Sequence, residues 1–537
     1  MHPFRRNCAE TWGTGTRCRA RAGSPNAIEN VTITFHSARV KLLLFAFVAG
    51  LVSACGFQPV GFWPLIPLSF TALLWLLARA PLLRDALAIG WWFALGQFVL
   101  GLNWIATAFT YQAAMPAWLG WVAVVLLSLY LAVYPAIAAG IAWRYGRRNP
   151  LALVLWLAAT WIVTEWLRAS LFTGFAWNPA GVALIDTPIV HLAPLVGTYG
   201  LSGMAVLIGG ALLLFVHRRW RSGLTIVIGI TLPSLVLTPF SKAPPGPPIR
   251  IVQPNIGQEE RWRGDGLDKL ERIAALSKTN ENGPRLLLWP ESAVTLPLED
   301  ARAGEDVEAA ALRRWIGQRI GRDDLLLTGG ITISSKNGNE ATGATNSIFA
   351  LAPDGRVLAR YDKAHLVPYG EYLPMRPLLS AIGLSRLAPG DLDFAPGPGP
   401  RTFTLPVVGK VGFQLCYEII FSGEVVDRRN RPDFIFNPSN DAWFGAWGPP
   451  QHLAQARLRA IEEGIPVLRA TPTGVSAVIA ADGRLRGSIP QHREGVIDDV
   501  LPYPFPPTLF ARFGNLLPML FALLLAAVAI AVGRKAR

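Results

Sequence analysis

Three residues in the C-terminal half of the chain carry side chains that together could transfer an acyl group. Cys416 and Glu291 each stand at the end of an apolar, strand-like run, and Lys363 lies in the sequence Tyr-Asp-Lys-Ala-His. A thiol can act as a nucleophile, a carboxylate as a base and an ammonium group as a stabilising cation. Such a set is able to form a thioester from an acyl donor and to pass the acyl group to an acceptor.

Each of these residues also has an ordinary interpretation when it is taken alone. A buried cysteine is more often a packed and inert thiol. A glutamate after a strand is often a surface carboxylate, and most lysines are solvated. The catalytic hypothesis therefore depends on the three residue types occurring together in one domain.

The composition predicts that much of the chain lies in lipid. Of the 537 residues, 51% are hydrophobic and only 16% are charged, whereas soluble domains carry about 25% charged residues. The formal net charge of +14 does not indicate nucleic-acid binding, because the arginines lie between apolar segments rather than on one continuous face.

The cysteines and histidines indicate neither a disulfide framework nor a metal site. Besides Cys416 the chain contains Cys8, Cys18 and Cys55, and no CxxC or Cys/His ligand spacing occurs. The seven histidines are scattered along the chain. We therefore expect no metal and no cofactor.

Eight apolar stretches approach the ~20 residues that a membrane-spanning helix needs. They cover residues 40–57, 61–79, 86–109, 117–143, 151–171, 195–216, 223–239 and 510–533. Lys and Arg gather before the first stretch and after the second, fourth, sixth and eighth, while the loops after the first and third carry none. The positive-inside rule then places both termini in the cytoplasm and the segment between the last two stretches outside, in the periplasm of a cell with two membranes.

This pattern divides the chain into four parts. They are a polar extension that we expect to be disordered, 1–38, a membrane domain of seven helices, 39–240, an external domain, 248–500, and a C-terminal membrane helix, 508–533. In the external domain strand-like runs alternate with helical patterns, which indicates an α/β layered fold. The sequence Val-Ser-Ala-Cys that ends at Cys55 is similar to a lipoprotein signal cleavage site, but a first membrane helix is preferred because it completes the alternation of charge.

Longer motifs surround the three candidate residues. They are Val-Gln-Pro-Asn-Ile from Val252, Trp-Pro-Glu-Ser around Glu291, the run Tyr361–Pro374, Cys-Tyr-Glu from Cys416, Ser-Asn-Asp-Ala-Trp-Phe-Gly from Ser439, Gln-Ala-Arg from Gln455 and Arg-Ala-Thr from Arg469. Over 249–485 the chain resembles the nitrilase superfamily, and nearly the whole chain resembles its membrane branch, the apolipoprotein N-acyltransferases. The resemblance implies a polytopic α-helical membrane domain joined to an α/β domain that forms an αββα sandwich.

The resemblance also implies roles for particular residues. Cys416 is the expected nucleophile and acyl carrier, Glu291 the base, and Lys363 the cation that stabilises the oxyanion. Four further positions match supporting residues of the family, namely Glu371 beside the triad, Tyr417 and Glu418 next to the nucleophile, and Trp262 on a mobile loop over the site. Two positions depart from the family pattern and affect loop detail rather than the triad, Pro254 and Pro472.

The activity that the resemblance implies takes place at a bacterial inner membrane. A fatty acyl chain would pass from a membrane phospholipid, phosphatidylethanolamine, to a thioester on Cys416. It would then pass to the α-amino group of the N-terminal diacylglyceryl-cysteine of an apolipoprotein, in a ping-pong scheme. We expect the enzyme to be a monomer.

Two alternatives use the same sequence features differently. A membrane-tethered nitrilase or amidase would use the same triad to hydrolyse a small C–N substrate, and it would release free acid without a lipid donor. A transporter or lipid-binding scaffold with an inactive domain would retain its activity when Cys416 is replaced by alanine.

Several other polar residues receive a structural interpretation. We expect His365 and His452 to form structural hydrogen bonds, and Asn440 and Asp441 to shape a loop near the site. Two ionisable residues near the end of the fifth apolar stretch stand at helical i,i+3 spacing, Glu165 and Arg168. They could pair with each other or contact lipid head groups, because ionisable groups at membrane depth are often functional.

Overall fold

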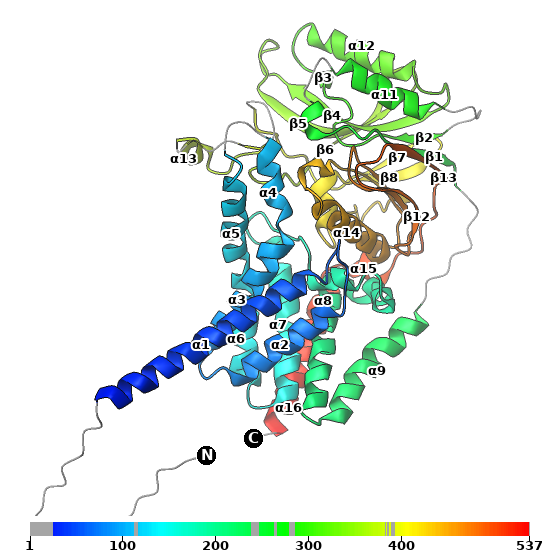
Figure 1. Ribbon diagram of the computed structural model, residues 1–537. Helices are drawn as coiled ribbons and strands as arrows, with labels where there is room; N and C mark the ends of the chain where they lie inside the picture. Colours follow the sequence, from blue (N-terminus) through cyan, green and yellow to red (C-terminus); the bar gives the residue numbers. More distant parts are fainter. Residues whose placement is uncertain are drawn as a thin grey trace, which may run out of the picture.

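The computed structural model consists of a bundle of helices and an α/β domain that contacts one end of it (Figure 1). It describes residues 25–111, 116–237, 246–261, 266–278, 285–381, 383, 386–387 and 392–535, with side chains from Arg39 onward. The helices of the bundle are α1 (Pro25–Ala54), α2 (Leu65–Arg79), α3 (Leu83–Gly101), α4 (Trp104–Ala108), α5 (Leu119–Leu131), α6 (Val133–Gly146), α7 (Pro150–Ser170), α8 (Ala193–Val216), α9 (Trp220–Val236), α15 (Leu509–Phe513) and α16 (Leu516–Lys535). Short 3-10 helices lie between them, η1 (Phe109–Tyr111), η2 (Ala180–Leu184) and η3 (Pro188–Leu192).

The first helix begins earlier than the sequence predicted. α1 starts at Pro25, so residues 25–38, which we expected to be disordered, are helical. Proline is favoured in the first turn of a helix, where no backbone N–H is needed. The apolar helix that follows also removes the cost of nucleation, because adding a turn to an existing helix is easier than starting one. The remainder of the extension, 1–24, lies outside the described residues.

Helices occupy each of the eight apolar stretches, but they differ in length. Among the described residues, four helical segments have the length and hydropathy of a membrane span, namely Leu119–Gly146, Pro150–Ser170, Pro188–Val216 and Leu516–Lys535. A fifth is added if Leu83–Gly101 and Trp104–Tyr111, which meet at a bend of 43°, form one span. α2 and α9 are apolar but shorter than the usual ~20 residues. The helical, apolar character of this region is therefore confirmed, and the number of eight spans stays a prediction.

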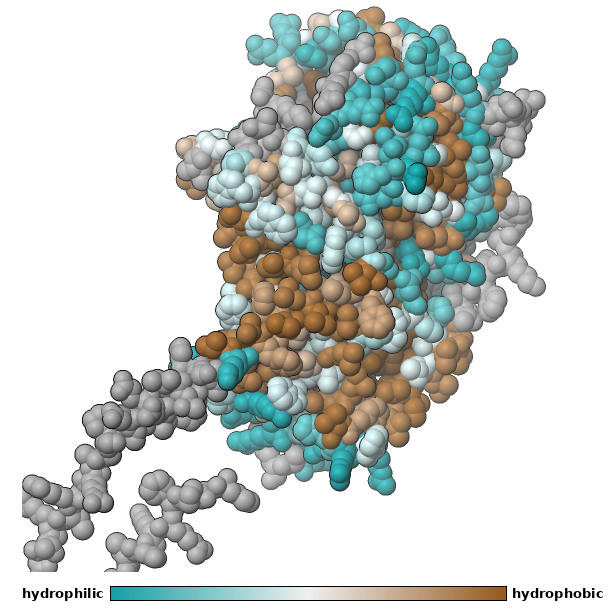
Figure 2. All heavy atoms as spheres, viewed as in Figure 1, coloured by the Kyte–Doolittle hydropathy of each residue, from teal (hydrophilic) through white to brown (hydrophobic). Residues whose placement is uncertain are grey.

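Large apolar side chains cover the outside of the bundle. Figure 2 shows hydrophobic residues in brown over the bundle and hydrophilic residues in teal over the outer part of the α/β domain. On α5, for example, Trp121, Val125 and Leu126 are exposed. A contiguous apolar surface of this kind is unfavourable in water but not in lipid, which indicates that the bundle lies in a membrane.

The α/β domain contains two sheets. Within the described residues, one sheet has the strand order β13-β1-β2-β4-β5-β6, with β3 also paired to β4, and the other has the order β12-β11-β10-β9-β8-β7. The strands of the first sheet are β1 (Pro248–Gln253), β2 (Leu286–Leu288), β3 (Pro297–Asp300), β4 (Leu325–Ser334), β5 (Gly343–Leu351), β6 (Val357–Asp362) and β13 (Gly495–Val500). Those of the second are β7 (Thr402–Leu405), β8 (Gly409–Phe413), β9 (Phe434–Pro438), β10 (Val467–Ala470), β11 (Ser476–Ile479) and β12 (Leu485–Ile489).

Helices cover the outer faces of the two sheets, so the layers run helix, sheet, sheet, helix. The helices and 3-10 turns are α10 (Gln258–Arg261), α11 (Leu267–Ser277), α12 (Glu305–Gly317), α13 (Arg376–Ala381), η4 (Cys416–Ile420), η5 (Asp441–Trp443) and α14 (Gly448–Glu463). α11 and α12 lie on the side of the first sheet that faces away from the bundle, and α14 lies between the second sheet and the bundle (Figure 1). This arrangement confirms the predicted α/β sandwich.

The strand sequences explain why both faces of the first sheet are buried. Successive side chains of a strand point to opposite faces. On β2, Leu286 and Leu288 belong to the core between the two sheets, while Leu287 packs in a separate cluster with Leu270 and Ile273 of α11. A strand that is covered on both sides needs a continuous apolar run rather than alternation, and Leu286–Leu288 is such a run.

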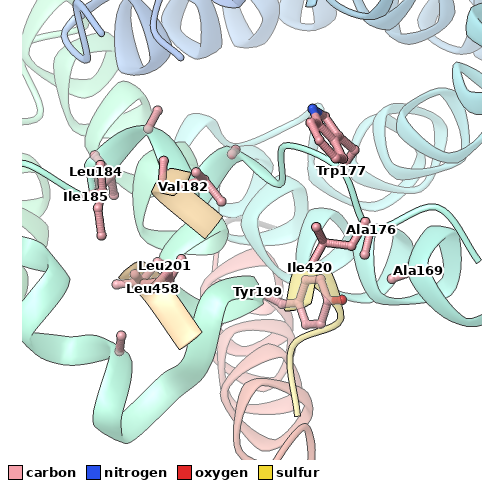
Figure 3. Close-up of a cluster of buried hydrophobic side chains, with 14 of the residues drawn as sticks. Ala169, Ala176, Trp177, Val182, Leu184, Ile185, Tyr199, Leu201, Ile420 and Leu458 are labelled. Atoms are coloured by element: carbon pink, nitrogen blue, oxygen red, sulfur yellow. The ribbon is translucent and has the colours of Figure 1, made fainter. Parts of the chain in front are cut away.

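Apolar contacts also join the α/β domain to the bundle. In Figure 3, Ile420 of η4 lies beside Ala169 of α7 and Tyr199 of α8, and Leu458 of α14 lies beside Leu201 of α8. All five side chains are buried. The α/β domain is therefore held on one end of the bundle by a packed interface rather than by its linkers alone.

A buried polar contact reinforces this interface at a break in α8. Gly197 has φ 63° inside α8, a conformation that glycine adopts at little cost, and a Cβ there would lie 2.2 Å from Phe510. The break frees the backbone N–H of Thr198, which donates to Glu462 Oε1 of α14 at 2.5 Å. The Thr198 hydroxyl donates to the same oxygen at 2.7 Å. The carboxylate thus accepts from the backbone N–H that the interrupted helix leaves without a partner, and also from the hydroxyl of the same residue.

Candidate active site

The candidate nucleophile stands at the carboxyl end of a parallel strand. Cys416 follows β8 and begins η4. β8 and β9 run parallel, and ligands of α/β domains bind at the carboxyl ends of such strands. The backbone of Cys416 has φ 52°, a left-handed conformation that is costly for a residue with a Cβ and that concentrates at functional sites.

The Cys416 thiol is buried and needs a base. Only 5% of the residue is exposed. Burial, and then the neighbouring Glu291 carboxylate, raise the pKa of the thiol well above its ordinary value, while Lys363 acts in the opposite direction. The thiol is therefore protonated at neutral pH, and its proton must be removed when it attacks a carbonyl group.

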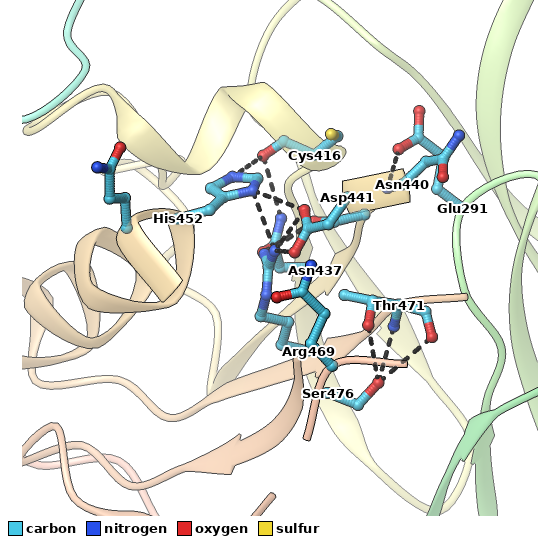
Figure 4. A network of polar contacts seen from close by, with 12 residues as sticks. Glu291, Cys416, Asn437, Asn440, Asp441, His452, Arg469, Thr471 and Ser476 are labelled. Atoms are coloured by element: carbon cyan, nitrogen blue, oxygen red, sulfur yellow. Dashed lines mark hydrogen bonds and ion pairs between the residues drawn. The ribbon is translucent and has the colours of Figure 1, made fainter. Parts of the chain in front are cut away.

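Glu291 is held by two donors from different segments. It follows β2, and its carboxylate accepts a hydrogen bond from Asn346 Nδ2 of β5 at 2.8 Å and from the backbone N–H of Asn440 at 2.6 Å. Asn440 comes shortly after β9, the strand next to β8. In Figure 4 the Cys416 sulfur is turned toward the side on which Asn440 and Glu291 lie. The carboxylate is thus fixed beside the thiol, where a general base has to be.

Lys363 is a buried cation with carboxylates around it. It follows β6, is 1% exposed, and its Nζ lies 2.8 Å from Glu371 Oε2. Burial lowers the pKa of the ammonium group, but the Glu371 and Glu291 carboxylates outweigh that effect and raise the pKa above its ordinary value. Lys363 therefore stays charged and can stabilise an oxyanion that forms beside it.

Comparison with known proteins places this arrangement in a family. Residues 49–211 match the model of the apolipoprotein N-acyltransferase N-terminal domain, and residues 249–500 match that of the carbon-nitrogen hydrolases. The apolipoprotein N-acyltransferase of Rhodopseudomonas palustris is 35% identical over 89% of this chain and 92% of its own length. That of Bradyrhizobium diazoefficiens is 35% identical over 92% of this chain and 95% of its own length.

The chain belongs to the apolipoprotein N-acyltransferase family. It is an N-acyltransferase whose catalytic domain has the nitrilase-like α/β fold. Among solved structures, Nit3 of Saccharomyces cerevisiae, a member of the nitrilase superfamily, is 17% identical over 49% of this chain and 93% of its own, with a TM-score of 0.35. At that score the likeness carries no weight for function.

The family resemblance implied four supporting residues. Two of them, Glu371 and Glu418, contact the candidate catalytic residues or the loops that carry them. Glu371 pairs with Lys363 and also accepts a hydrogen bond from Asn346 at 2.8 Å. Glu418 Oε1 accepts from the Tyr361 hydroxyl at 2.8 Å and from the backbone N–H groups of Ala364 and His365 at 2.8 and 3.0 Å, and its Oε2 accepts from Leu415 N at 2.7 Å. Glu418 thus ties the turn that begins at Cys416 to the loop that carries Lys363.

The other two implied supports differ in what the structure places around them. Tyr417 is buried, and its ring lies 5.2 Å from that of Phe421 and 5.8 Å from that of His365. Trp262 lies outside the described residues.

The two departures from the family pattern are adjacent to residues that contact each other. The Thr471 hydroxyl, beside Pro472, donates to Oε1 of Gln253 at 3.1 Å. Gln253 is the last residue of β1 and directly precedes Pro254. Both prolines are thus next to the same contact between the two sheets. Neither proline is close in sequence to Glu291, Lys363 or Cys416.

Three residues of the site make contacts that the sequence did not predict. Asn346 bridges Glu291 and Glu371, and its only sequence signal is a polar residue near the start of a buried strand, where a partner is required. Arg261 of α10 donates to the backbone carbonyl of Glu291 at 2.7 Å. Burial lowers the pKa of Arg261 to about 10, against the pull of Glu291. Asn440, which was expected only to shape a loop, supplies the second donor to Glu291.

Glu165 and Arg168 of α7 interact electrostatically with each other, and each also has hydrogen-bond partners that the sequence did not predict. Both are buried. Glu165 Oε1 accepts from Trp161 Nε1 and from Ala180 N, each at 2.9 Å, and Arg168 Nη1 donates to the carbonyl of Trp177 at 2.9 Å. Their partners therefore lie mainly in the segment after α7, which they hold against the end of the bundle.

Replacing Glu418 should destabilise the protein strongly. Glu418→Ala leaves three backbone N–H groups and one hydroxyl without their acceptor, at ~1–3 kcal/mol each. For a domain of this size, 1 kcal/mol shifts the melting temperature by about 2–4 °C. We therefore expect the melting temperature, measured by thermal unfolding in detergent, to fall by at least ~10 °C. Glu424→Ala, at an exposed carboxylate on the same segment, is the matched control. An equal shift in both variants would contradict the assigned role of Glu418.

Proposed function

We propose that this enzyme transfers a fatty acyl chain from a membrane phospholipid to the α-amino group of the N-terminal diacylglyceryl-cysteine of apolipoproteins. Phosphatidylethanolamine is the proposed donor, and Cys416 carries the acyl group as a thioester. The observation that carries the proposal is the placement of Cys416, Glu291 and Lys363 together in a domain that is packed onto an apolar helical bundle. A thiol in that position can meet an ester whose chains remain in lipid.

The first half-reaction acylates the thiol. Glu291 takes the proton from Cys416 while the sulfur attacks the ester carbonyl carbon, and the oxyanion that forms is stabilised by Lys363. Collapse of the tetrahedral intermediate breaks the ester C–O bond. The lysophospholipid leaves with the proton that Glu291 held, and the acyl chain stays on sulfur.

The second half-reaction forms the amide. The α-amino group of the acceptor attacks the thioester carbonyl, and Glu291 takes a proton from the attacking nitrogen. The C–S bond then breaks, and the proton returns to the leaving sulfur. The products are an N-acylated lipoprotein and the free thiol, so each cycle restores the enzyme.

Aromatic residues from both domains support the exclusion of water from the thioester. Phe444, in the loop after η5, packs with its ring centroid 4.6 Å from that of Trp104 and 5.5 Å from that of Trp177. Trp443 lies 6.1 Å from Tyr111. Packed aromatic side chains next to the site would limit hydrolysis, which would otherwise compete with transfer to an amine.

The test uses the purified enzyme, phosphatidylethanolamine with a labelled acyl chain, and a diacylated lipopeptide. We expect an N-acylated lipopeptide and a lysophospholipid in equal amounts, measured by mass spectrometry. Without the lipopeptide, no more than one lysophospholipid per enzyme should form. Continuous release of free fatty acid without acceptor would instead indicate a hydrolase, and unchanged activity in Cys416→Ala would exclude the thioester.

We also propose that the enzyme spans the inner membrane several times as a monomer, with both termini in the cytoplasm and the catalytic domain in the periplasm. The alternation of Lys and Arg between the apolar stretches supports this orientation. All three triad residues come from one chain, so a second copy is not needed to complete the site. Light scattering of the detergent-solubilised enzyme tests the monomer.

The orientation predicts which added cysteines an impermeant maleimide can reach. With the cysteines other than Cys416 replaced by serine, Asn339→Cys in the exposed β4–β5 loop should react in intact spheroplasts. Tyr145→Cys, at an exposed position beside the basic loop after α6, should react only after the membrane is opened. The reverse pattern would overturn the proposed topology.

A further inference from the structure

The backbone carbonyl of the nucleophile has a side-chain donor of its own. His452 Nε2, on α14, lies 3.1 Å from the Cys416 carbonyl oxygen, and Asn437 Nδ2 lies 3.4 Å from it. A carbonyl oxygen can only accept a hydrogen bond, so the His452 ring carries a hydrogen on Nε2 and donates it. This contact falls on the residue whose backbone has the strained φ of 52°.

The other side of the His452 ring is fixed by a buried ion pair. Nδ1 lies 3.0 Å from Asp441 Oδ1 and 3.0 Å from Arg469 Nη2. Arg469 Nη2 also donates to Asp441 Oδ2 at 2.6 Å, and none of the three side chains is exposed. Figure 4 shows this network between the Cys416 carbonyl and the β9 and β10 strand ends. The ring therefore has one permitted orientation.

The faces of the His452 ring are packed by aromatic residues from two other segments. Trp177, which follows α7 of the bundle, lies with its ring centroid 5.3 Å from the imidazole, and Phe444 lies at 5.8 Å. Trp177 is itself held at both ends, because its Nε1 donates to Gln451 Oε1 at 2.7 Å and its carbonyl accepts from Arg168. A residue of the membrane domain thus forms one wall around the group that binds the carbonyl of the nucleophile.

We propose that His452 is a positioning residue that holds Cys416 in its left-handed conformation, and that Trp177 of the membrane domain acts through His452. Asn437 Nδ2 makes its shorter hydrogen bond to the Gln414 carbonyl, at 2.7 Å, so His452 is the main donor to the Cys416 carbonyl. The strained backbone of Cys416 relaxes when this donor is lost. The thiol then moves away from Glu291, and a displacement of about 1 Å costs roughly 10²-fold in rate. This positioning role deepens the proposed function. It rests on the proposed function only where the measured quantity is acyl transfer.

Two variants separate the role of the donor from that of the ring. His452→Gln can place its amide N–H near the position of Nε2, whereas the shorter His452→Asn can reach only the position of Nδ1 beside Asp441. Acylation by phosphatidylethanolamine, followed in single turnovers by quenched mass spectrometry, should slow ~10²-fold in His452→Asn, with the half-saturating phospholipid concentration unchanged within about threefold. His452→Gln should stay within about fivefold of the parent. Equal losses in both variants, or none in either, would overturn the proposal.

A double-mutant comparison tests the part played by the membrane domain. Trp177→Ala should slow acylation, and Trp177→Ala combined with His452→Asn should be no slower than His452→Asn alone, because the two act along one path. Additive losses would show that Trp177 does not act through His452. Trp143→Ala is the matched control for loss of a buried tryptophan. Trp143 donates a hydrogen bond to the Ala80 carbonyl near the N-terminal end of α7, whereas Trp177 follows the C-terminal end. The control should change stability without changing the rate per folded enzyme.

Alkylation of Cys416 by iodoacetamide, resolved by peptide mass spectrometry, separates failure of this inference from failure of the proposed function. The alkylation rate at fixed pH should fall in His452→Asn and recover in His452→Gln, whatever the natural substrate is. If that pattern holds while no thioester forms with phospholipid, the proposed function is wrong and the positioning role stands. If the thioester forms equally fast in all variants, the positioning role is wrong and the function stands.

Discussion

Incubation with phosphatidylethanolamine alone should add the mass of one acyl chain to the enzyme, on Cys416. The buried thiol lies beside the Glu291 carboxylate, and without an amine acceptor the thioester cannot be resolved. Intact-protein mass spectrometry measures the adduct, and neutral hydroxylamine should remove it because thioesters are cleaved under conditions that spare oxygen esters and amides. We expect full occupancy in the parent and none in Cys416→Ala.

The control for this experiment is Cys55→Ala. Cys55 is a free, partly exposed thiol at the end of α1, and its removal should leave the adduct unchanged. An adduct that persists in Cys416→Ala, or one that disappears in Cys55→Ala, would assign the acyl group to another residue. Failure to form any adduct under conditions that support transfer to a lipopeptide would point to direct transfer without a thioester.

Replacing Glu291 and Lys363 should slow acylation to similar extents but with different dependence on pH. Glu291→Gln removes the base and should cost ~10²–10⁴-fold at neutral pH. Because the pKa of the Cys416 thiol lies well above its ordinary value, the thiolate fraction increases as pH rises, and the rate should recover in part. Glu291 itself raises that pKa, so in the variant the recovery begins at a lower pH than it would with the carboxylate present.

Lys363→Met removes the cation and should cost ~10²–10³-fold, the effect of a lost oxyanion donor. Lys363 lowers the pKa of the thiol, so its removal shifts thiolate formation to still higher pH. Alkali restores part of the thiolate but not the charge that stabilises the oxyanion, and the variant should therefore stay far below the parent across the pH range.

The measurement is the single-turnover acylation rate of both variants against pH. Recovery of Lys363→Met to the parental rate in alkali, together with no recovery of Glu291→Gln, would require the two roles to be exchanged. Thermal unfolding of each variant is the control, because Lys363→Met leaves Glu371 without its 2.8 Å partner and a buried unpaired carboxylate is destabilising.

The sequence predicted the apolar helices and the α/β domain that the structure shows, and it singled out the three candidate catalytic residues, whose roles stay a prediction. Apolar runs end at Glu291 and just before Cys416. The residue that follows a strand lies at the end of the sheet where that strand finishes. The length of apolar stretches likewise predicted helices in lipid, since both signals are local and depend on residues that are close in the chain. The boundary at 1–38 was less well predicted, because a helix that is already formed can extend into polar sequence.

The tertiary structure alone decided which residues support that site. Asn346 and Asn440 reach Glu291 from segments 55 and 149 residues away, and His452 reaches the Cys416 carbonyl from a helix 36 residues away. Glu165 and Arg168 interact electrostatically, as their spacing allowed, but their hydrogen bonds to the segment after α7 were not predicted. Hydrogen bonds of this kind form because buried polar groups must find partners wherever the packing of the sheets and helices brings them, and no local spacing records which distant segment that packing supplies.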